Sequence, residues 1–159
     1  MTRVAILEDH QLLAETLSTA LRRSGVSARI LPLTTVVAEL LADLALDPAD
    51  LVVLDLDLGQ LGDSVHLIPH LVAAGHRVLI LTGSEDRLRI AAALEQGALG
   101  YQLKDPGFDA LLVRVSAALD ARAPLDAEHR VELLDELVRA RASSTARRSE
   151  ERRVGKECW

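Results

Sequence analysis

The chain has 159 residues, of which 49% are hydrophobic and 26% charged, which is enough for one hydrophobic core and too little for two domains of ordinary size. No apolar stretch approaches the roughly 20 residues of a membrane span, and acids appear already at Glu8 and Asp9, so we expect a cytoplasmic protein without a signal peptide. The single cysteine, Cys158, excludes a disulfide framework and a cysteine-based zinc site, and the net charge of -6 argues against nucleic-acid binding by these residues.

Five short apolar runs alternate with longer segments of helical periodicity, which is the pattern of an α/β domain with a parallel sheet. The runs cover residues 4–7, 28–31, 51–56, 78–81 and 99–103. The first, third and fourth runs are nearly continuous in apolar residues, which predicts central strands covered by helices on both faces. Pro69 lies inside the third helical segment, so we expect that helix to begin late or to bend.

A different pattern begins at residue 122. Ala127, Val131, Leu134 and Val138 form a narrow apolar stripe with spacings of four, three and four, which predicts a linker helix within residues 122–141. The stripe could pack on the domain or on a second copy of the chain, and the spacing does not distinguish the two. Residues 142–159 are rich in charge without apolar periodicity, so we expect them to be disordered.

The last residues have an unusual property. The segment RSEERRVGKEC, residues 148–158, can be encoded by an oligonucleotide that resembles a common sequencing adapter read in frame. We therefore expect residues from about 148 to 159 to be translated adapter, although Trp159 does not continue that reading, and the natural protein to continue beyond about residue 147. A natural tail rich in Arg and Glu is the alternative.

Polar side chains gather at the carboxyl ends of the predicted strands, the edge at which open parallel sheets bind ligands. They are Glu8, Asp9, Asp55, Asp57, Thr82 and Lys104. Crowded carboxylates repel one another unless a cation lies between them, and oxygen ligands suit Mg²⁺. Lys104 and Thr82 add a positive charge and a hydroxyl donor, which the charged oxygens of a phosphoryl group require. The set predicts an aspartyl-phosphate site.

Four motifs carry a resemblance to a known family. Glu8-Asp9-His10, LVVLDLDLG around Asp55, LTG around Thr82 and GALGYQLKD around Lys104 together resemble the receiver domain of two-component response regulators, over residues 1–121. The resemblance implies a flavodoxin-like (βα)5 fold with a five-stranded parallel sheet in the order 2-1-3-4-5. It also implies a sensor histidine kinase as phosphoryl donor, a domain that assists only its own phosphorylation and dephosphorylation, and a homodimer formed on phosphorylation.

The resemblance also implies a role for each site residue. Asp55 is the implied phosphoacceptor. The implied Mg²⁺ ligands are Asp9, Asp55, the backbone carbonyl of Asp57, and Glu8 through a water molecule. The implied phosphoryl-binding and switch residues are Thr82, Lys104 and Tyr101. In this scheme the Thr82 hydroxyl turns toward the phosphoryl group and the Tyr101 ring rotates inward, which reshapes the face built by the fourth helix, the fifth strand and the fifth helix.

Within the family, EDHQLLAETL, LDLDLG, GYQLKD and PLDAEHRVELLDEL most resemble regulators with a LuxR-type helix-turn-helix output. The 159 residues contain no such output domain, so we expect no direct DNA binding by them. Two alternatives are a stand-alone receiver that acts through protein contacts and a haloacid-dehalogenase-type phosphatase. The phosphatase would use Asp55 as nucleophile and Asp57 as general acid and base, but that family carries its DxD motif on the first strand and follows it with Thr or Val.

Overall fold

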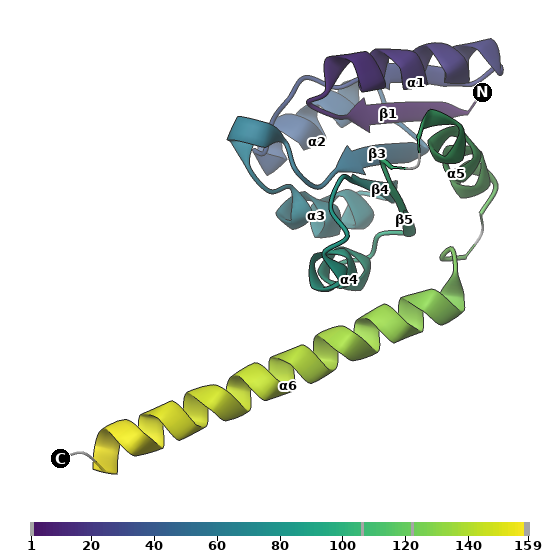
Figure 1. Cartoon of the computed structure of the whole chain (residues 1–159). Coiled ribbons are helices and arrows are strands. Elements are labelled where there is room, and N and C mark those ends of the chain that lie inside the picture. Colours follow the sequence, from purple (N-terminus) through teal and green to yellow (C-terminus); the bar gives the residue numbers. More distant parts are fainter. Residues whose placement is uncertain (1, 106, 122, 158–159) are drawn as a thin grey trace.

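The computed structural model describes residues 2–105, 107–121 and 123–157, with side chains to residue 150. Figure 1 shows a sheet between two layers of helices and a long helix at the C-terminal end. The strands are β1 (Arg3–Leu7), β2 (Ser27–Ile30), β3 (Leu51–Asp55), β4 (Arg77–Thr82) and β5 (Gly100–Leu103). The helices are α1 (Gln11–Arg23), α2 (Val37–Leu46), α3 (Ile68–Ala73), α4 (Arg87–Glu95), α5 (Phe108–Asp120) and α6 (Ala127–Glu157).

The five strands form one parallel sheet in the order β2-β1-β3-β4-β5, which confirms the predicted fold and strand order. β1, β3 and β4 occupy the centre, as their continuous apolar runs predicted. All five residues of β3 are buried, because helices cover both faces of the sheet there. All five strands run in the same direction, so their carboxyl ends lie at one edge.

Alternate residues of each central strand face opposite layers of the molecule, since side chains alternate across a strand. Val53 and Leu79 pack with α1 and α5 on one face, while Val52 and Ile80 pack with α2, α3 and α4 on the other. Figure 1 shows the same division of the helices. The two apolar clusters fix the sheet between its helices and thereby hold its carboxyl edge in place.

The third helix begins late, as Pro69 predicted. A short 3-10 turn, Val65–Leu67, precedes α3, and Pro69 lies in the first turn of α3. Proline is tolerated there because the first amides of a helix have no partner inside the helix.

The C-terminal segment differs from the prediction. We expected disorder from residue 142, but α6 continues as a helix to Glu157. The docked first half of α6 already provides the helical nucleus, and the residues that follow are mostly Ala, Arg, Ser and Glu, without proline, so extension costs little. Residues 141–150 are exposed, and this end of α6 extends past the α/β body in Figure 1.

The apolar stripe proposed for the linker helix is not the face that packs. Val131 and Val138 are exposed, with relative exposures of 58% and 61%, whereas Leu133 is fully buried and Leu137 nearly so. Of the four stripe residues only Leu134 is partly buried against the core.

The described helices include none that combines the length and the apolar composition needed to cross a bilayer.

Candidate functional site

Two acidic side chains are buried side by side where β1 and β3 end. Glu8 follows β1 directly and Asp55 is the last residue of β3, and the pairing of Leu7 with Leu54 brings these ends together. Glu8 is 3% exposed and Asp55 1% exposed. Asp9, one residue further along, is exposed. Glu8 and Asp55 therefore lie in surroundings of low polarity, and Asp9 lies on the solvent-exposed side of the site.

Lys104 connects the two buried carboxylates. Its Nζ donates to Glu8 Oε1 at 2.6 Å and to Asp55 Oδ2 at 2.9 Å. The Lys104 amide donates to the Thr82 carbonyl, which places the start of this long side chain just beyond β4 and β5. Hydrogen bonds to ionised groups are stronger than neutral ones, so Lys104 both neutralises charge and orients Asp55.

The pKa values show that one lysine does not balance the acids. Burial raises the pKa of the Asp55 carboxyl, and the neighbouring Glu8 carboxylate raises it further, to about 6, against the opposing effects of Lys104 and the Asp57 amide. Desolvation and the nearby Asp55 also raise the pKa of Asp9. Burial lowers the pKa of the Lys104 ammonium, but its hydrogen bonds to Glu8 and Asp55 outweigh this and leave it above its ordinary value. A second cation would be stabilised here.

The donor atoms fit a hard divalent cation. Glu8, Asp9 and Asp55 each offer a carboxylate oxygen, and these oxygens lie within 4.8 Å of one another, the one such cluster among the described residues. Glu8 Oε2 is buried without a hydrogen-bond partner. A buried oxygen without a partner is costly, so a metal ion or its bound water at this place would satisfy it. Oxygen ligands of this kind suit Mg²⁺.

The loop after β3 closes one side of the site. The Asp57 amide donates to Asp55 Oδ1 at 3.0 Å, and the Gly59 amide donates to Asp57 Oδ1 at 3.1 Å. Gly59 adopts φ +64°, and a Cβ atom on it would lie 2.8 Å from Asp9 Oδ2. A side chain at this position would displace the Asp9 carboxylate, and glycine adopts the positive φ without steric cost.

Two further side chains, those of Ser64 and Arg89, brace this loop, and no sequence motif marks them. The buried Ser64 hydroxyl donates to the Asp55 carbonyl at 2.5 Å. Arg89, from α4, donates to the Leu56 carbonyl at 2.7 Å and to Asp63 Oδ2 at 2.9 Å. Their partners are mostly backbone atoms of a turn, and no sequence spacing signals such contacts.

The two expected switch residues form hydrogen bonds with partners other than Asp55. Thr82 ends β4, and its hydroxyl donates to the Ser84 carbonyl at 3.1 Å and accepts from the Ser84 amide. Tyr101 pairs with Ile80 in the sheet, and its hydroxyl lies 2.7 Å from Nε2 of His129 in α6. Burial raises the pKa of the Tyr101 hydroxyl. Both side chains are thus engaged elsewhere than on Asp55 in this conformation.

A five-stranded parallel sheet with two buried acids, a third acid that is exposed and a lysine at its carboxyl edge defines the class of protein. Residues 4–116 match the family of the response regulator receiver domain, and the chain belongs to that family.

Known relatives agree with this assignment. The transcriptional regulatory protein CutR of Streptomyces coelicolor is 36% identical over 116 residues, which cover 72% of this chain and 52% of CutR, so the chain spans about half the length of the curated relatives it matches. A response regulator protein from Burkholderia pseudomallei, solved with a phosphorylated aspartic acid, is 25% identical with a TM-score of 0.66, over 86% of this chain and 75% of that one. A response regulator from Thermotoga maritima, 23% identical, shares the fold with a TM-score of 0.65 over 76% of this chain and 99% of that one.

Proposed function

We propose that this chain accepts a phosphoryl group on Asp55 from a sensor histidine kinase and relays the signal through a change of its surface. The observation that carries the proposal is the lysine bridge: Lys104 Nζ lies within hydrogen-bond distance of both Asp55 and Glu8 at the carboxyl edge of the sheet. This places a fixed positive charge beside the oxygen that would react. A phosphoryl group arriving there brings charged oxygens that such a cation stabilises.

The transfer assigns one task to each residue. An ionised Asp55 oxygen forms the new bond to phosphorus while the bond from phosphorus to the donor breaks. Lys104 would stabilise the charge on the phosphoryl oxygens, and Thr82 would donate its hydroxyl to one of them after leaving Ser84. With a pKa of about 6, Asp55 is mostly ionised at pH 7 and can act as the nucleophile.

Mg²⁺ is the proposed cofactor. Asp9 and Asp55 would hold it directly, with the backbone carbonyl of Asp57, and Glu8 would bind through a water molecule; the unpartnered Glu8 Oε2 supports that last role. When bound, the ion supplies positive charge to the phosphoryl oxygens. Asp57 contributes its backbone because its exposed side chain is already engaged by the Gly59 amide.

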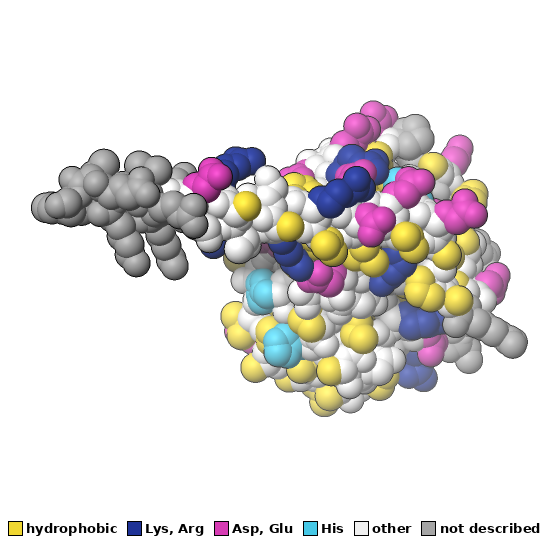
Figure 2. Space-filling view, turned by 90° about the horizontal axis from the view of Figure 1, so that it is seen from below, with side chains coloured by type: hydrophobic (Ala, Val, Ile, Leu, Met, Phe, Trp, Pro, Cys, Tyr) yellow, Lys and Arg dark blue, Asp and Glu magenta, His cyan; other side chains and the backbone are white. Residues whose placement is uncertain are grey.

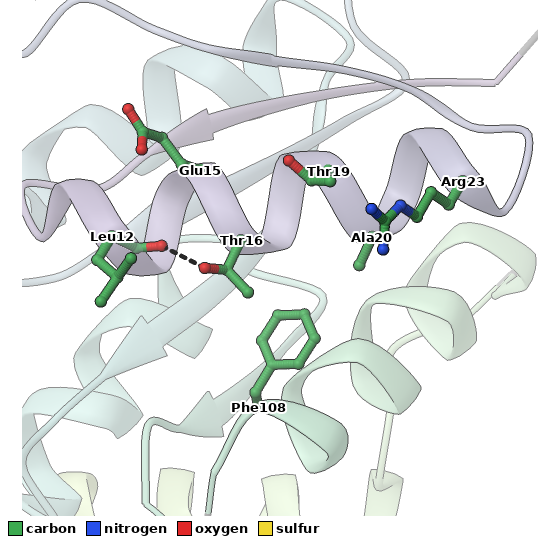
Figure 3. Close-up of a pocket in the computed structure, with 7 residues that line it drawn as sticks. All are labelled: Leu12, Glu15, Thr16, Thr19, Ala20, Arg23 and Phe108. Atoms are coloured by element: carbon green, nitrogen blue, oxygen red, sulfur yellow. Dashed lines mark hydrogen bonds between the residues drawn. The ribbon is translucent and has the colours of Figure 1, made fainter.

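A groove beside this edge offers a docking place for the kinase. It lies between α1 and α5, has a volume of about 470 Å³, and is lined by Leu12 and Phe108 among others (Figure 3). Leu12 is 69% exposed. α1 begins two residues after Asp9 and α5 begins four residues after Lys104, so a helix laid in this groove would have its donor histidine close to Asp55.

The output of the parent protein is a second part of the proposal. CutR is named a transcriptional regulatory protein, which supports a transcriptional role for the parent of this chain. The LuxR-type output rests on the sequence motifs alone, and a stand-alone receiver is the alternative. Four statements stay predictions: the homodimer on phosphorylation, the absence of DNA binding by these residues, the domain limits at residues 121 and 141, and the adapter origin of residues 148–159.

Labelling by a small phosphodonor tests the proposed function. We expect acetyl phosphate to add one phosphoryl group per chain in the presence of Mg²⁺, detected by intact-mass spectrometry, and to add none in excess EDTA. Acetate leaves as the bond to Asp55 forms. Sustained release of nitrophenol from p-nitrophenyl phosphate would instead favour the phosphatase alternative, because a receiver is expected to stop at stoichiometric labelling. Phosphoryl groups added while EDTA is present would contradict the proposed role of the metal.

Substitution of Gly59 by alanine tests the metal position. We expect Gly59→Ala to weaken Mg²⁺ binding about tenfold, because the new Cβ displaces the Asp9 carboxylate. Gly62→Ala is the matched control: Gly62 lies in the same loop at φ +88°, so it carries similar backbone strain, but nothing lies within 4 Å of its Cβ position. Isothermal titration with MgCl₂ measures both. Equal affinities for the two variants would show that Asp9 does not hold the metal.

A further inference from the structure

The loop after β3 is a small hairpin whose two arms are joined by backbone hydrogen bonds. Asp57 and Asp63 face each other in an antiparallel bridge. A backbone hydrogen bond lies on either side of this pair, from Leu58 to Gly62 at 2.9 Å and from Ser64 to Leu56 at 3.1 Å. Because these bonds flank the pair, the amide and the carbonyl of Asp57 both point away from the other arm. The Asp57 amide donates to Asp55 Oδ1, so the Asp57 carbonyl is on the side of the acidic site.

The Arg89 side chain joins the two arms from outside the hairpin. Its guanidinium, which comes from α4, donates to the Leu56 carbonyl at 2.7 Å in one arm and to Asp63 Oδ2 at 2.9 Å in the other. The other Asp63 oxygen accepts from the Val65 amide at 2.7 Å, so this carboxylate is held by two partners. The donors of a guanidinium lie in a rigid plane, and one such group therefore fixes the spacing of both arms.

The two partners of Arg89 are the immediate neighbours of Asp57. Leu56 precedes Asp57 in the chain, and Asp63 lies opposite it in the bridge. A peptide group whose neighbours on both sides are fixed cannot turn freely. Arg89 therefore holds the direction of the Asp57 carbonyl, which is the proposed backbone ligand of Mg²⁺.

We propose that Arg89 is a positioning residue of the Mg²⁺ site, which acts through the hairpin and holds the Asp57 carbonyl in its ligating direction before the ion binds. The inference rests on the proposed function, which assigns Mg²⁺ to this edge of the sheet. Ligands that are already ordered bind an ion more tightly than ligands that the ion must first order, because ordering a backbone costs free energy. Arg89 thus sets the Mg²⁺ concentration at which Asp55 can be phosphorylated.

Removal of Arg89 distinguishes a positioning role from a simple effect of charge. Loss of a cation near the site would by itself strengthen Mg²⁺ binding, because like charges repel. We expect the opposite: Arg89→Met, which keeps the aliphatic part of the side chain, should weaken Mg²⁺ binding about tenfold, as is usual for the loss of an outer contact of a metal site. Arg89→Lys keeps the charge but lacks the planar fork, so it should weaken binding about threefold.

Three measurements on the full chain test this role. Isothermal titration with MgCl₂ gives the affinity. The Mg²⁺ concentration for half-maximal labelling by acetyl phosphate should rise with the loss of affinity, while the rate at saturating Mg²⁺ changes less than twofold. Amide hydrogen exchange at Ser64 in EDTA should rise about fivefold in Arg89→Met, because its acceptor, the Leu56 carbonyl, is no longer fixed, and saturating Mg²⁺ should reverse much of this rise.

Arg87→Met is the matched control. Arg87 lies two residues earlier on α4 and pairs with Glu136 of α6, the helix that lies across the α/β body in Figure 2. This substitution also removes one cation from the first turn of α4, but the loop after β3 keeps all its contacts. We expect unchanged Mg²⁺ affinity and unchanged exchange at Ser64.

The outcomes separate this inference from the proposed function. Equal or tighter Mg²⁺ binding by Arg89→Met, with unchanged exchange at Ser64, would overturn the inference alone, and so would a slower rate at saturating Mg²⁺ with unchanged affinity. Should Arg89→Met not fold, Arg89→Lys decides by the same measurements. Mg²⁺ binding without labelling of the unchanged chain would overturn the proposed function, and absence of Mg²⁺ binding by the unchanged chain would overturn both.

Discussion

Asp55→Asn is expected to abolish labelling by acetyl phosphate while making the metal-free protein less sensitive to pH. The amide has the shape of the carboxyl group but is no nucleophile, so intact-mass spectrometry should detect no phosphoryl adduct. Asp57→Asn is the control, because Asp57 is exposed and contributes its backbone to the site. Label on Asp55→Asn equal to that on the unchanged chain would place the phosphoacceptor elsewhere.

The pH effect follows from the raised pKa of Asp55. The folded protein holds this proton up to about pH 6, whereas the unfolded chain releases it near the ordinary value of 3.8. The stability contributed by the protonated group is complete below about pH 4 and is lost as the pH rises toward 6. We expect urea unfolding in EDTA to show a loss on the order of 2 kcal/mol over this range, and Asp55→Asn to lack that part of it. Parallel pH profiles for the two proteins would refute the raised pKa.

Lys104→Met is expected to destabilise the metal-free protein at pH 7 by about 3 kcal/mol, because it leaves Glu8 and Asp55 buried without their counter-charge. Methionine replaces the aliphatic part of the lysine side chain, so the lost packing is small. Chemical denaturation in EDTA measures the effect. It should shrink when Mg²⁺ is added, since the ion replaces part of the missing positive charge, and also at pH 5, where Asp55 is mostly protonated.

A double-mutant cycle isolates the charge term. In the Asp55→Asn background, Lys104→Met leaves one buried carboxylate instead of two, so we expect it to cost clearly less than in the unchanged chain. Arg87→Met serves as the control for loss of a cation, because the pair of Arg87 with Glu136 is exposed to solvent and screened. Equal costs of Lys104→Met in both backgrounds would show that Lys104 does not stabilise Asp55.

Much of the site could be predicted because parallel strands bring their carboxyl ends to one edge. Glu8, Asp55 and Lys104 each follow an apolar run, so a sheet of any strand order compatible with the pattern collects them. The loop that completes the site was not predictable in the same way. Gly59 leaves room for Asp9 because it has no Cβ atom where the loop approaches that carboxylate, and Arg89 reaches the Leu56 carbonyl from α4.

The C-terminal helix shows the same limit. The stripe through Val131 and Val138 has regular helical spacing, yet Leu133 and Leu137 pack on the domain. Both sets of residues satisfy a helical period, so periodicity alone does not choose between them. The choice depends on α4, whose C-terminal carbonyls bind Arg130 and thereby set the rotation of α6.

The order of apolar runs and the acids that follow them were sufficient to establish the α/β fold, its central strands and the acidic edge of the sheet. These features depend on hydrophobic periodicity and chain direction, which are local properties that the residue order records. The orientation of Tyr101 toward His129, the bridge from Lys104 and the face of α6 that is buried were decided only when distant segments packed together. Such contacts depend on which surfaces lie opposite one another after packing, and local hydrophobic periodicity does not record this.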